Sequence, residues 1–315
     1  MPLRWGLLST ARINDALLGG LAASASGDVV AVASRDITRA RAYAEARGIS
    51  EAHEGYEALL ADPGVDAVYI SLPNALHLEW TERALRAGKH VLCEKPMGRD
   101  PERVAAAFDL ARERGLVLME AFMYRHHPQT LRLSELVAQG AVGDLRSIRS
   151  HFSFLLGDPG DPRLSAQLEG GALMDLGCYC VSAARLLAGE PEAFAGVQVR
   201  GGDGVDSAFA GSLRFDGGVV AAFEASFRSA AGHGLEVTGE RGALRVADPW
   251  HARAPGIELV DSVAARRIEV PSADSYRLEV EDLARAVAGD AAPRLGRDDA
   301  VGQARALQQL YAAAA

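Results

Sequence analysis

Lysine is nearly absent from this chain. Of its 33 basic residues, only Lys89 and Lys95 are lysines and all the others are arginines. A surface cation can be replaced by arginine at little cost, so the lysine that remains in the stretch LCEKPM, Lys95, indicates chemistry that a guanidinium does not supply. Two lysines in 315 residues can also be chance. Both interpretations stay open at this point.

Cysteine and metal-ligand patterns are also scarce. The three cysteines, Cys93, Cys178 and Cys180, lack CxxC spacing, which argues against a disulfide framework. Cys178 and Cys180 are two apart in a predicted helix and point to different sides, so we expect buried packing rather than chelation. The eight histidines show neither HxxxH nor HxH spacing, and we therefore expect no metal site.

Long basic and long apolar runs are missing as well. No run of Lys or Arg exceeds two residues and the net charge is -9, which excludes a nucleic-acid footprint. No unbroken run of about 18 apolar residues occurs, and the first residues, MPLRWGLLST, lack a basic region followed by an apolar stretch. We expect a soluble cytoplasmic protein with small-molecule partners and neither nucleic acid nor membrane.

The length of 315 residues, with 49% hydrophobic content, predicts two domains. Strand-like runs that are apolar throughout alternate with helical stretches over the first 120 residues. This rhythm predicts a doubly wound parallel sheet with helices on both faces, a Rossmann domain spanning residues 1–122. The expected strands are 3–8, 28–34, 66–73, 89–96 and 116–120, with helices 38–47, 76–88 and 100–114 between them.

The second half has a different pattern. Residues 211–229 form two alternating runs around Asp216-Gly217-Gly218, and residues 235–248 repeat this about Glu240-Arg241-Gly242, so both predict β-hairpins. Helices over 171–188 and from about 276 to 288 are expected to cover one face of this sheet. Residues 123–315 are therefore predicted to form an α+β domain with a mostly antiparallel sheet.

A candidate phosphate-binding turn follows the first strand. The stretch GLLSTA matches GxGxxG at Gly6 and approximately at Ala11, but Leu8 replaces the middle glycine, so the motif alone is weak. The second strand ends in Ser34-Arg35, where NAD enzymes commonly carry an acidic residue. A hydroxyl and a guanidinium suit the 2'-phosphate of NADP(H) instead. Asp36 is the rival feature, because it is an acidic residue one position after the place where NAD enzymes carry theirs.

Six stretches in order, GLLSTARI, ASRD, YISLPNALH, AGKHVLCEKPM, MEAFMYRHHPQ and GGALMDLGCYCV, resemble the Gfo/Idh/MocA oxidoreductases. The branch with dimeric dihydrodiol dehydrogenase and NADP-dependent xylose dehydrogenase is the most similar. The resemblance implies an open-faced second sheet and hydride exchange with NADP(H) at a carbinol or hemiacetal carbon. Ser9 replaces a common glycine. We assign cofactor binding to Gly6, Ser9, Thr10, Ala11, Arg12, Ile13, Ser34, Arg35, Arg39, Ser71, Leu72, Pro73, Asn74, His77, Glu94 and Lys95.

Lys95, Tyr179 and Asp175 are the candidate catalytic residues. A tyrosine with pKa near 10 is a poor base at neutral pH, and a nearby ammonium lowers that pKa. Lys95 follows a strand at the edge where parallel sheets bind ligands. Asp175 and Tyr179 are four apart in a predicted helix and share one face, so they can point together at a substrate hydroxyl. Taken alone, such a pair is more often a surface aspartate and a core tyrosine without a catalytic role.

Further residues are assigned to the substrate, each with a structural alternative. Arg125 and His127 either hold a polyol or acid or tie the domains together, Trp250 is positioned to stack on a ring, and Asp175 and Tyr179 complete the set. His77 either lines the nicotinamide or only starts a helix.

The expected function is oxidation of an aldose at C1, with oxidation of a trans-dihydrodiol second and reduction of a keto-sugar third. The competing class is an idle dinucleotide-binding sensor. A homodimer through the second domain is expected, because Val220, Ala222 and Ser226 lie among charges on one face of the sheet.

Overall fold

The computed structural model describes residues 2–201 and 203–314. Contacts within the chain divide it into two compact units. The first combines residues 1–123 with 274–301, and the second combines residues 124–273 with 302–315. The assignment of substrate binding and dimerisation to the second unit stays a prediction.

A six-stranded parallel sheet forms the centre of the first unit, in the order β3-β2-β1-β4-β5-β6. All four residues of β4 are buried, as expected of a strand whose two faces are both covered by helices. This sheet confirms the predicted Rossmann fold. The strands are β1 (Leu3–Leu8), β2 (Gly27–Ser34), β3 (Glu51–Glu54), β4 (Ala67–Ile70), β5 (His90–Glu94) and β6 (Leu118–Ala121).

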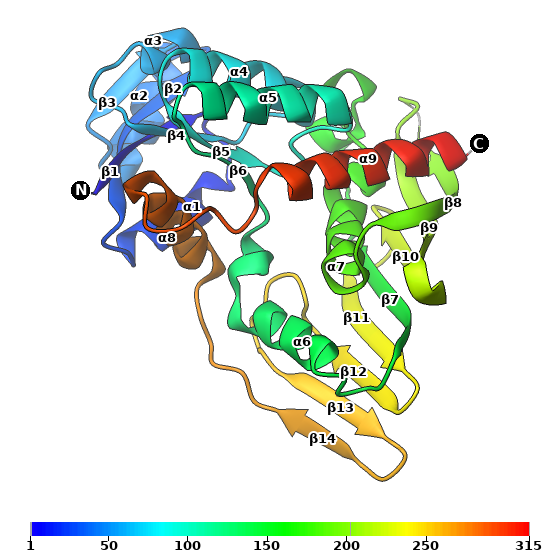
Figure 1. Ribbon diagram of the computed structural model, residues 1–315. Coiled ribbons are helices and arrows are strands. Elements are labelled where there is room, and N and C mark those ends of the chain that lie inside the picture. Colours follow the sequence, from blue (N-terminus) through cyan, green and yellow to red (C-terminus); the bar gives the residue numbers. More distant parts are fainter. Residues whose placement is uncertain (1, 202, 315) are drawn as a thin grey trace. The chain divides into compact units, whose positions relative to one another are not determined.

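Helices connect and cover these strands. In Figure 1, α4 and α5 run side by side along the sheet, and α1 lies against α8. The helix α8 was expected to cover the second sheet, and that prediction is wrong: it packs on α1, where a Cβ at Gly20 would lie 2.7 Å from the backbone of Arg277. The helices are α1 (Asn14–Ala22), α2 (Ile37–Arg47), α3 (Tyr56–Leu60), α4 (His77–Arg86), α5 (Pro101–Glu113) and α8 (Ser275–Ala288).

The second unit is built on an eight-stranded sheet, in the order β14-β13-β12-β11-β7-β10-β9-β8. Only the pair β7 and β10 is parallel, so the sheet is mostly antiparallel, and both predicted hairpins, β9–β10 and β11–β12, are present. The strands are β7 (Leu145–Ser153), β8 (Pro191–Arg200), β9 (Asp206–Phe215), β10 (Val220–Ser226), β11 (Gly232–Gly239), β12 (Gly242–Val246), β13 (Ile257–Asp261) and β14 (Ala265–Ile268).

The two faces of this sheet differ. One face packs against α6 (Pro128–Ala138), α7 (Cys178–Ala188) and the later residues of α9 (Arg297–Ala313). On the other face alternate residues are exposed, among them Val197 at 71% and Val220 at 45%. Ser226 lies on this face by its alternation with Val220 and Ala222, as expected, but it is buried, at 2% exposed.

The core helix of the second unit begins irregularly. Residues Leu173–Gly177 form a π-helical turn before α7, whereas the sequence predicted one regular helix. The surrounding segment Ala166–Ala188 is long and apolar enough to cross a membrane by length and composition alone, but 72% of its apolar window is buried within the protein. Such burial is usual for the core helix of a soluble protein. Cys178 and Cys180 are both buried free thiols.

Candidate functional site

The turn after β1 is strained and held by side chains. Ser9 has φ of 140°, a backbone region that favours glycine. Its hydroxyl lies 2.7 Å from the hydroxyl of Ser71, which donates a 2.6 Å hydrogen bond to Asn14, and Asn14 in turn donates to the carbonyl oxygen of Ser9 at 3.0 Å. This closed network joins the carboxyl ends of β1 and β4 at one edge of the sheet.

The amino end of α1 suits a phosphate group. Among the described residues no side chain caps α1, whereas Asp36 caps α2 and Asp100 caps α5. The N–H groups of Asn14, Asp15 and Ala16 donate to carbonyl oxygens of the preceding turn at 3.0 to 3.2 Å. An anion would therefore be received by that turn, with the helix dipole of α1 behind it. The turn at Ser9 to Ile13 therefore fits the pyrophosphate of a dinucleotide.

The end of β2 presents cations. Arg35 and Arg39 are exposed, and both lie close enough to the Tyr56 hydroxyl to oppose the rise in its pKa that burial causes. The carboxylate of Asp36 accepts the Thr38 N–H at 2.8 Å and so caps its own helix. One oxygen of the rival carboxylate is thus used in the helix cap, and Arg35 and Arg39 supply the positive charge of this edge.

His77 links two loops at the same edge. Its Nδ1 lies 2.8 Å from the carbonyl oxygen of Pro96 and its Nε2 lies 2.7 Å from that of Leu72. The residue is 1% exposed, and burial lowers the pKa of its imidazole while the two carbonyl groups oppose that shift. In the structure His77 thus holds the segment after Lys95 to the segment after β4. Its contact with a nicotinamide stays a prediction.

Lys95 is half-buried at the end of β5, beside polar groups of the first unit. Its backbone N–H donates to the Glu94 carboxylate at 3.3 Å, and the Tyr69 hydroxyl donates to the same carboxylate. Burial raises the pKa of Tyr276, with Glu94 adding to the rise and the Lys95 ammonium opposing it. The Lys95 ammonium therefore lies close enough to the Tyr276 phenol to affect its pKa.

Tyr179 belongs to an aromatic cluster in the second unit. Its ring centroid lies 5.6 Å from that of Phe152, 5.7 Å from that of Tyr124 and 5.8 Å from that of Trp250. Trp250 is fully buried and donates its indole N–H to the His151 carbonyl oxygen at 3.2 Å. Tyr179 itself is 9% exposed, so its ring is fixed by packing.

Asp175 lies in the π-helical turn, so the α-helical spacing to Tyr179 that the sequence suggested does not apply over its whole length. The carboxylate of Asp175 forms an ion pair with Arg163 Nε at 3.0 Å. Lys95 belongs to the first unit and Tyr179 with Asp175 to the second. Their joint action on a substrate stays a prediction.

The other expected substrate residues are held inside the second unit. Arg125 donates to the Ser182 hydroxyl at 3.0 Å, and Tyr124 donates to the same atom at 2.8 Å. His127 is 1% exposed and caps α6 by accepting the Gln129 N–H at 3.0 Å. These contacts lie within one unit and test neither alternative. The contact of Arg125, His127 or Trp250 with a substrate, and a tie between the domains through Arg125 and His127, stay predictions.

Sequence reasoning missed the carboxylate that holds the start of the core helix. Asp206, at the beginning of β9, accepts the Leu173 N–H at 2.6 Å and the Tyr311 hydroxyl at 2.7 Å. Gly171, with φ of 123°, leaves room for it, because a Cβ there would lie 2.2 Å from the carboxylate oxygen. Burial raises the pKa of Asp206 to about 6, although these donors oppose the shift.

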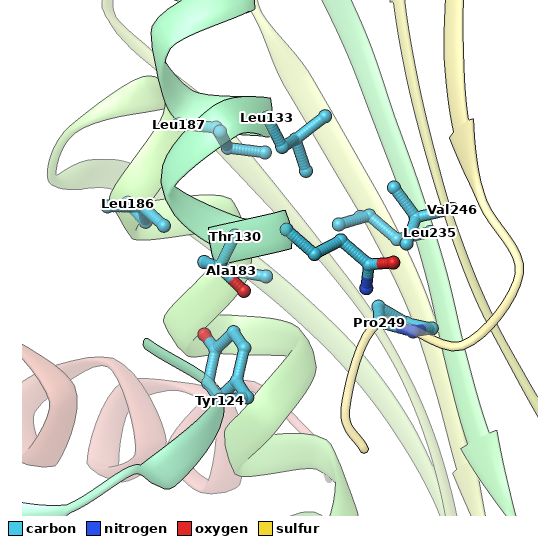
Figure 2. Close-up of a pocket in the computed structure, with 10 residues that line it drawn as sticks. Tyr124, Thr130, Leu133, Ala183, Leu186, Leu187, Leu235, Val246 and Pro249 are labelled. Atoms are coloured by element: carbon cyan, nitrogen blue, oxygen red, sulfur yellow. The ribbon is translucent and has the colours of Figure 1, made fainter. Parts of the chain in front are cut away.

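The apolar hollow between α6, α7 and the sheet is not a ligand site. Figure 2 shows Leu133, Leu186 and Leu187 on the helices facing Leu235 and Val246 on the strands. The space that they leave is about 10 Å³. A volume of this size is room for one water molecule at most, so the hollow cannot hold a sugar or a cofactor.

The fold and the anion-binding edge define a dinucleotide-dependent oxidoreductase. Residues 4–122 match the model of the oxidoreductase family with an NAD-binding Rossmann fold, and residues 130–245 match the GFO/IDH/MocA C-terminal domain. The chain belongs to the Gfo/Idh/MocA oxidoreductase family, as the sequence motifs predicted.

Three relatives illustrate the similarity. D-xylose 1-dehydrogenase (NADP(+)) 2 of Haloferax volcanii is 39% identical over 99% of this chain and 97% of its own length. Trans-1,2-dihydrobenzene-1,2-diol dehydrogenase of Sus scrofa is 35% identical over 87% of this chain and 82% of its own. A crystal structure of a 3-ketoreductase from Actinomadura kijaniata with NADP and TDP-benzene has a TM-score of 0.93 and 35% identity, covering 100% and 98% of the two chains.

Replacement of Asp206 by asparagine should change how stability depends on pH. The pKa is about 6 in the folded protein and near 3.8 when unfolded, so the wild type loses about 2 to 3 kcal/mol of stability as the pH rises from 4 to 6. Asp206→Asn loses hydrogen-bond acceptors and should be less stable at every pH, but without this slope. The measurement is thermal unfolding between pH 4.5 and 7.5.

The control for this series is Asp28→Asn, which alters an exposed carboxylate on β2. It should reproduce the wild-type pH dependence. Parallel curves for the wild type and Asp206→Asn would show that Asp206 does not titrate in this range.

Proposed function

We propose that this chain is an NADP(H)-dependent oxidoreductase that oxidises an aldose at C1, with trans-dihydrodiol oxidation and keto-sugar reduction as the next candidates. The observation that carries the proposal is Lys95, a half-buried lysine in a chain that otherwise uses arginine, at the ligand-binding edge of the parallel sheet. The relatives named above include an NADP-dependent xylose dehydrogenase, a dihydrodiol dehydrogenase and a sugar ketoreductase.

The residues of the chain fit NADP(H). The turn from Ser9 to Ile13, which leads into α1, receives the pyrophosphate, and the exposed Arg35 receives the 2'-phosphate, while one oxygen of Asp36 caps α2. When bound, the cofactor supplies the nicotinamide carbon that exchanges hydride with the substrate.

The proton is handled by the protein. Tyr179, deprotonated with the help of the Lys95 ammonium, accepts the proton of the reacting hydroxyl, and Lys95 holds the substrate oxygen. Asp175, paired with Arg163, orients the same hydroxyl. Packing against Phe152 and Trp250 fixes the direction of the Tyr179 ring.

The competing proposal is an idle dinucleotide-binding sensor. Such a protein needs the phosphate turn and Arg35, but neither Lys95 nor Tyr179. A spectrophotometric screen of NADP+ reduction across aldoses, polyols, inositols and dihydrodiols separates the two. Turnover of any of these supports the enzyme, whereas tight NADPH binding without turnover supports the sensor.

We also propose that the enzyme works in the cytoplasm.

Arg35 should decide cofactor preference. Its hydrogen bonds to the 2'-phosphate contribute about 1.5 to 3 kcal/mol, so Arg35→Ala should weaken NADPH binding about ten- to a hundredfold and leave NADH binding nearly unchanged. Fluorescence titration with both reduced cofactors measures this. Arg41→Ala, at an exposed arginine of α2, the helix that follows Arg35, serves as the control. Tighter NADH than NADPH binding in the wild type would contradict the proposal.

Lys95→Arg should fail to support catalysis. A guanidinium is planar and bulky, whereas the ammonium points one donor at a shared oxygen, so we expect turnover to fall about a hundredfold or more in Lys95→Arg, Lys95→Met and Tyr179→Phe. NADPH affinity should change little. Tyr43→Phe, at a buried tyrosine of α2, is the control. Near-normal turnover in Lys95→Arg would end the mechanism proposed here.

The open face of the second sheet is proposed to form a homodimer. Val197, Val199 and Val220 expose 71%, 44% and 45% of their surface on β8 and β10. Beside them lies a row of charged residues, one on each of five neighbouring strands, whose charges alternate in sign. A second copy can complement this row about a two-fold axis. The row consists of Arg149, Glu236, Arg245, Glu258 and Arg267.

Val197→Asp should disrupt this assembly. Burying an unpaired carboxylate at an interface is costly, so the wild type should scatter light as twice 33.2 kDa and the variant as 33.2 kDa at micromolar concentration. Val263→Asp, at a valine 91% exposed between β13 and β14, should remain a dimer. A monomeric wild type would rule out the proposed interface.

A further inference from the structure

Three polar side chains form a cluster in the second unit that the proposed mechanism does not use. His233 lies on β11, and Asp248 and His251 lie in the loop after β12. The Asp248 carboxylate is 3.4 Å from His233 Nε2 and 3.6 Å from His251 Nδ1, and the two imidazole centroids are 6.1 Å apart. We refer to these three residues as the His–Asp–His cluster.

The cluster lies one ring away from Tyr179. His233 is paired with Phe152 in the register of β11 and β7, so the two side chains share the face of the sheet that α7 covers. The Phe152 centroid is 6.4 Å from that of His233, 5.7 Å from that of His251 and 5.6 Å from that of Tyr179. Phe152 therefore connects both imidazoles to the candidate catalytic tyrosine.

The imidazoles are the accessible part of this region. Their side chains are 28% and 33% exposed for His233 and His251, while Phe152 is 9% exposed and Trp250 fully buried. The Nδ1 atom of His251 is itself buried and faces Asp248, so the exposed part of that ring is the side with Nε2. A ligand that reaches Tyr179 across Phe152 would meet polar nitrogen atoms at this rim.

Asp248 fixes the cluster and sets its charge. Its carboxylate accepts the backbone N–H groups of His251 at 3.1 Å and Arg253 at 3.0 Å. Burial raises its pKa, but these donors and the two imidazoles outweigh burial and the pKa is lowered. Burial and the Arg253 guanidinium lower the pKa of His251. At neutral pH the cluster thus has an ionised carboxylate beside an uncharged His251 ring.

We propose that His233 and His251, oriented by Asp248, bind the hydroxyl groups of the substrate that are remote from the reacting carbon. One nitrogen of each imidazole faces Asp248, and the other nitrogen can form a hydrogen bond with a hydroxyl group, which both donates and accepts. The Phe152 edge offers an apolar surface to the C–H groups between those hydroxyls. This inference rests on the proposed function and narrows it, because the Asp248 carboxylate repels anions and so favours a neutral polyol over a phosphorylated or nucleotide-linked sugar.

The test compares His233→Leu and His251→Leu with the wild type on D-xylose and its 4-deoxy analogue. A neutral hydrogen bond is worth about three- to tenfold in affinity, so each variant should raise the KM for D-xylose by that factor with kcat nearly unchanged. NADPH affinity should not change. With the deoxy analogue as substrate, at least one of the two variants should have the same KM as the wild type. His251→Asn should restore part of the affinity for D-xylose that His251→Leu loses.

His151→Leu is the matched control, because His151 lies on the same strand as Phe152 but on the opposite, exposed face. It should alter neither kcat nor KM. Unchanged KM for D-xylose in both histidine variants, or an equal rise on both sugars, would overturn the inference.

Calorimetric titration of D-xylose into the NADPH complex gives a readout that does not need turnover. Weaker binding in the histidine variants than in the wild type supports the inference. If the wild type binds the sugar but does not turn it over, the proposed function is wrong, while the inference about the His–Asp–His cluster still holds. If the wild-type complex binds no neutral polyol, or binds a sugar phosphate more tightly, the inference fails.

Discussion

Parallel strands all end at the same edge of their sheet, and the candidate site of the first unit depends on this constraint. Ser9 follows β1, Ser71 follows β4 and Lys95 follows β5, so residues far apart in the sequence are brought together without any direct sequence signal. Hydrogen bonds then fix the loops at that edge. The Ser9, Ser71 and Asn14 network joins the loops after β1 and β4, and His77 joins the loop after β4 to the segment after Lys95.

Much of this architecture follows from hydrophobic pattern. The apolar strands of the first sheet were predicted, because a strand buried on both faces is a continuous apolar run. The hairpins of the second sheet were predicted, because a strand buried on one face alternates apolar and polar residues. The strand Glu51–Glu54 was missed because its sequence, EAHE, has no apolar run. The partner of α8 was assigned wrongly, since an amphipathic pattern shows which face is buried but not what covers it.

The polar parts of the site were less predictable. Arg35 and Lys95 could be proposed from the sequence because residue type and place along a strand already limit their roles, and those roles stay predictions. Asn14 and Asp206 were missed, since each acts through partners that only the fold supplies. The capping by Asp36 was available from the sequence, because an aspartate directly before a helix commonly caps it. The π-helical turn beside Asp175 has no comparable signal.

Neither of the two lysines is fully exposed to solvent. The Lys89 ammonium donates to the carbonyl oxygens of Asp62 at 2.7 Å and Val65 at 2.8 Å, and the residue is only 7% exposed. Lys95 is half-buried at the ligand-binding edge. Reagents that acylate amines will therefore find almost no side-chain targets on this protein, and a single modified lysine per molecule would label the candidate site itself. Covalent chemistry that is unselective on most proteins becomes selective here.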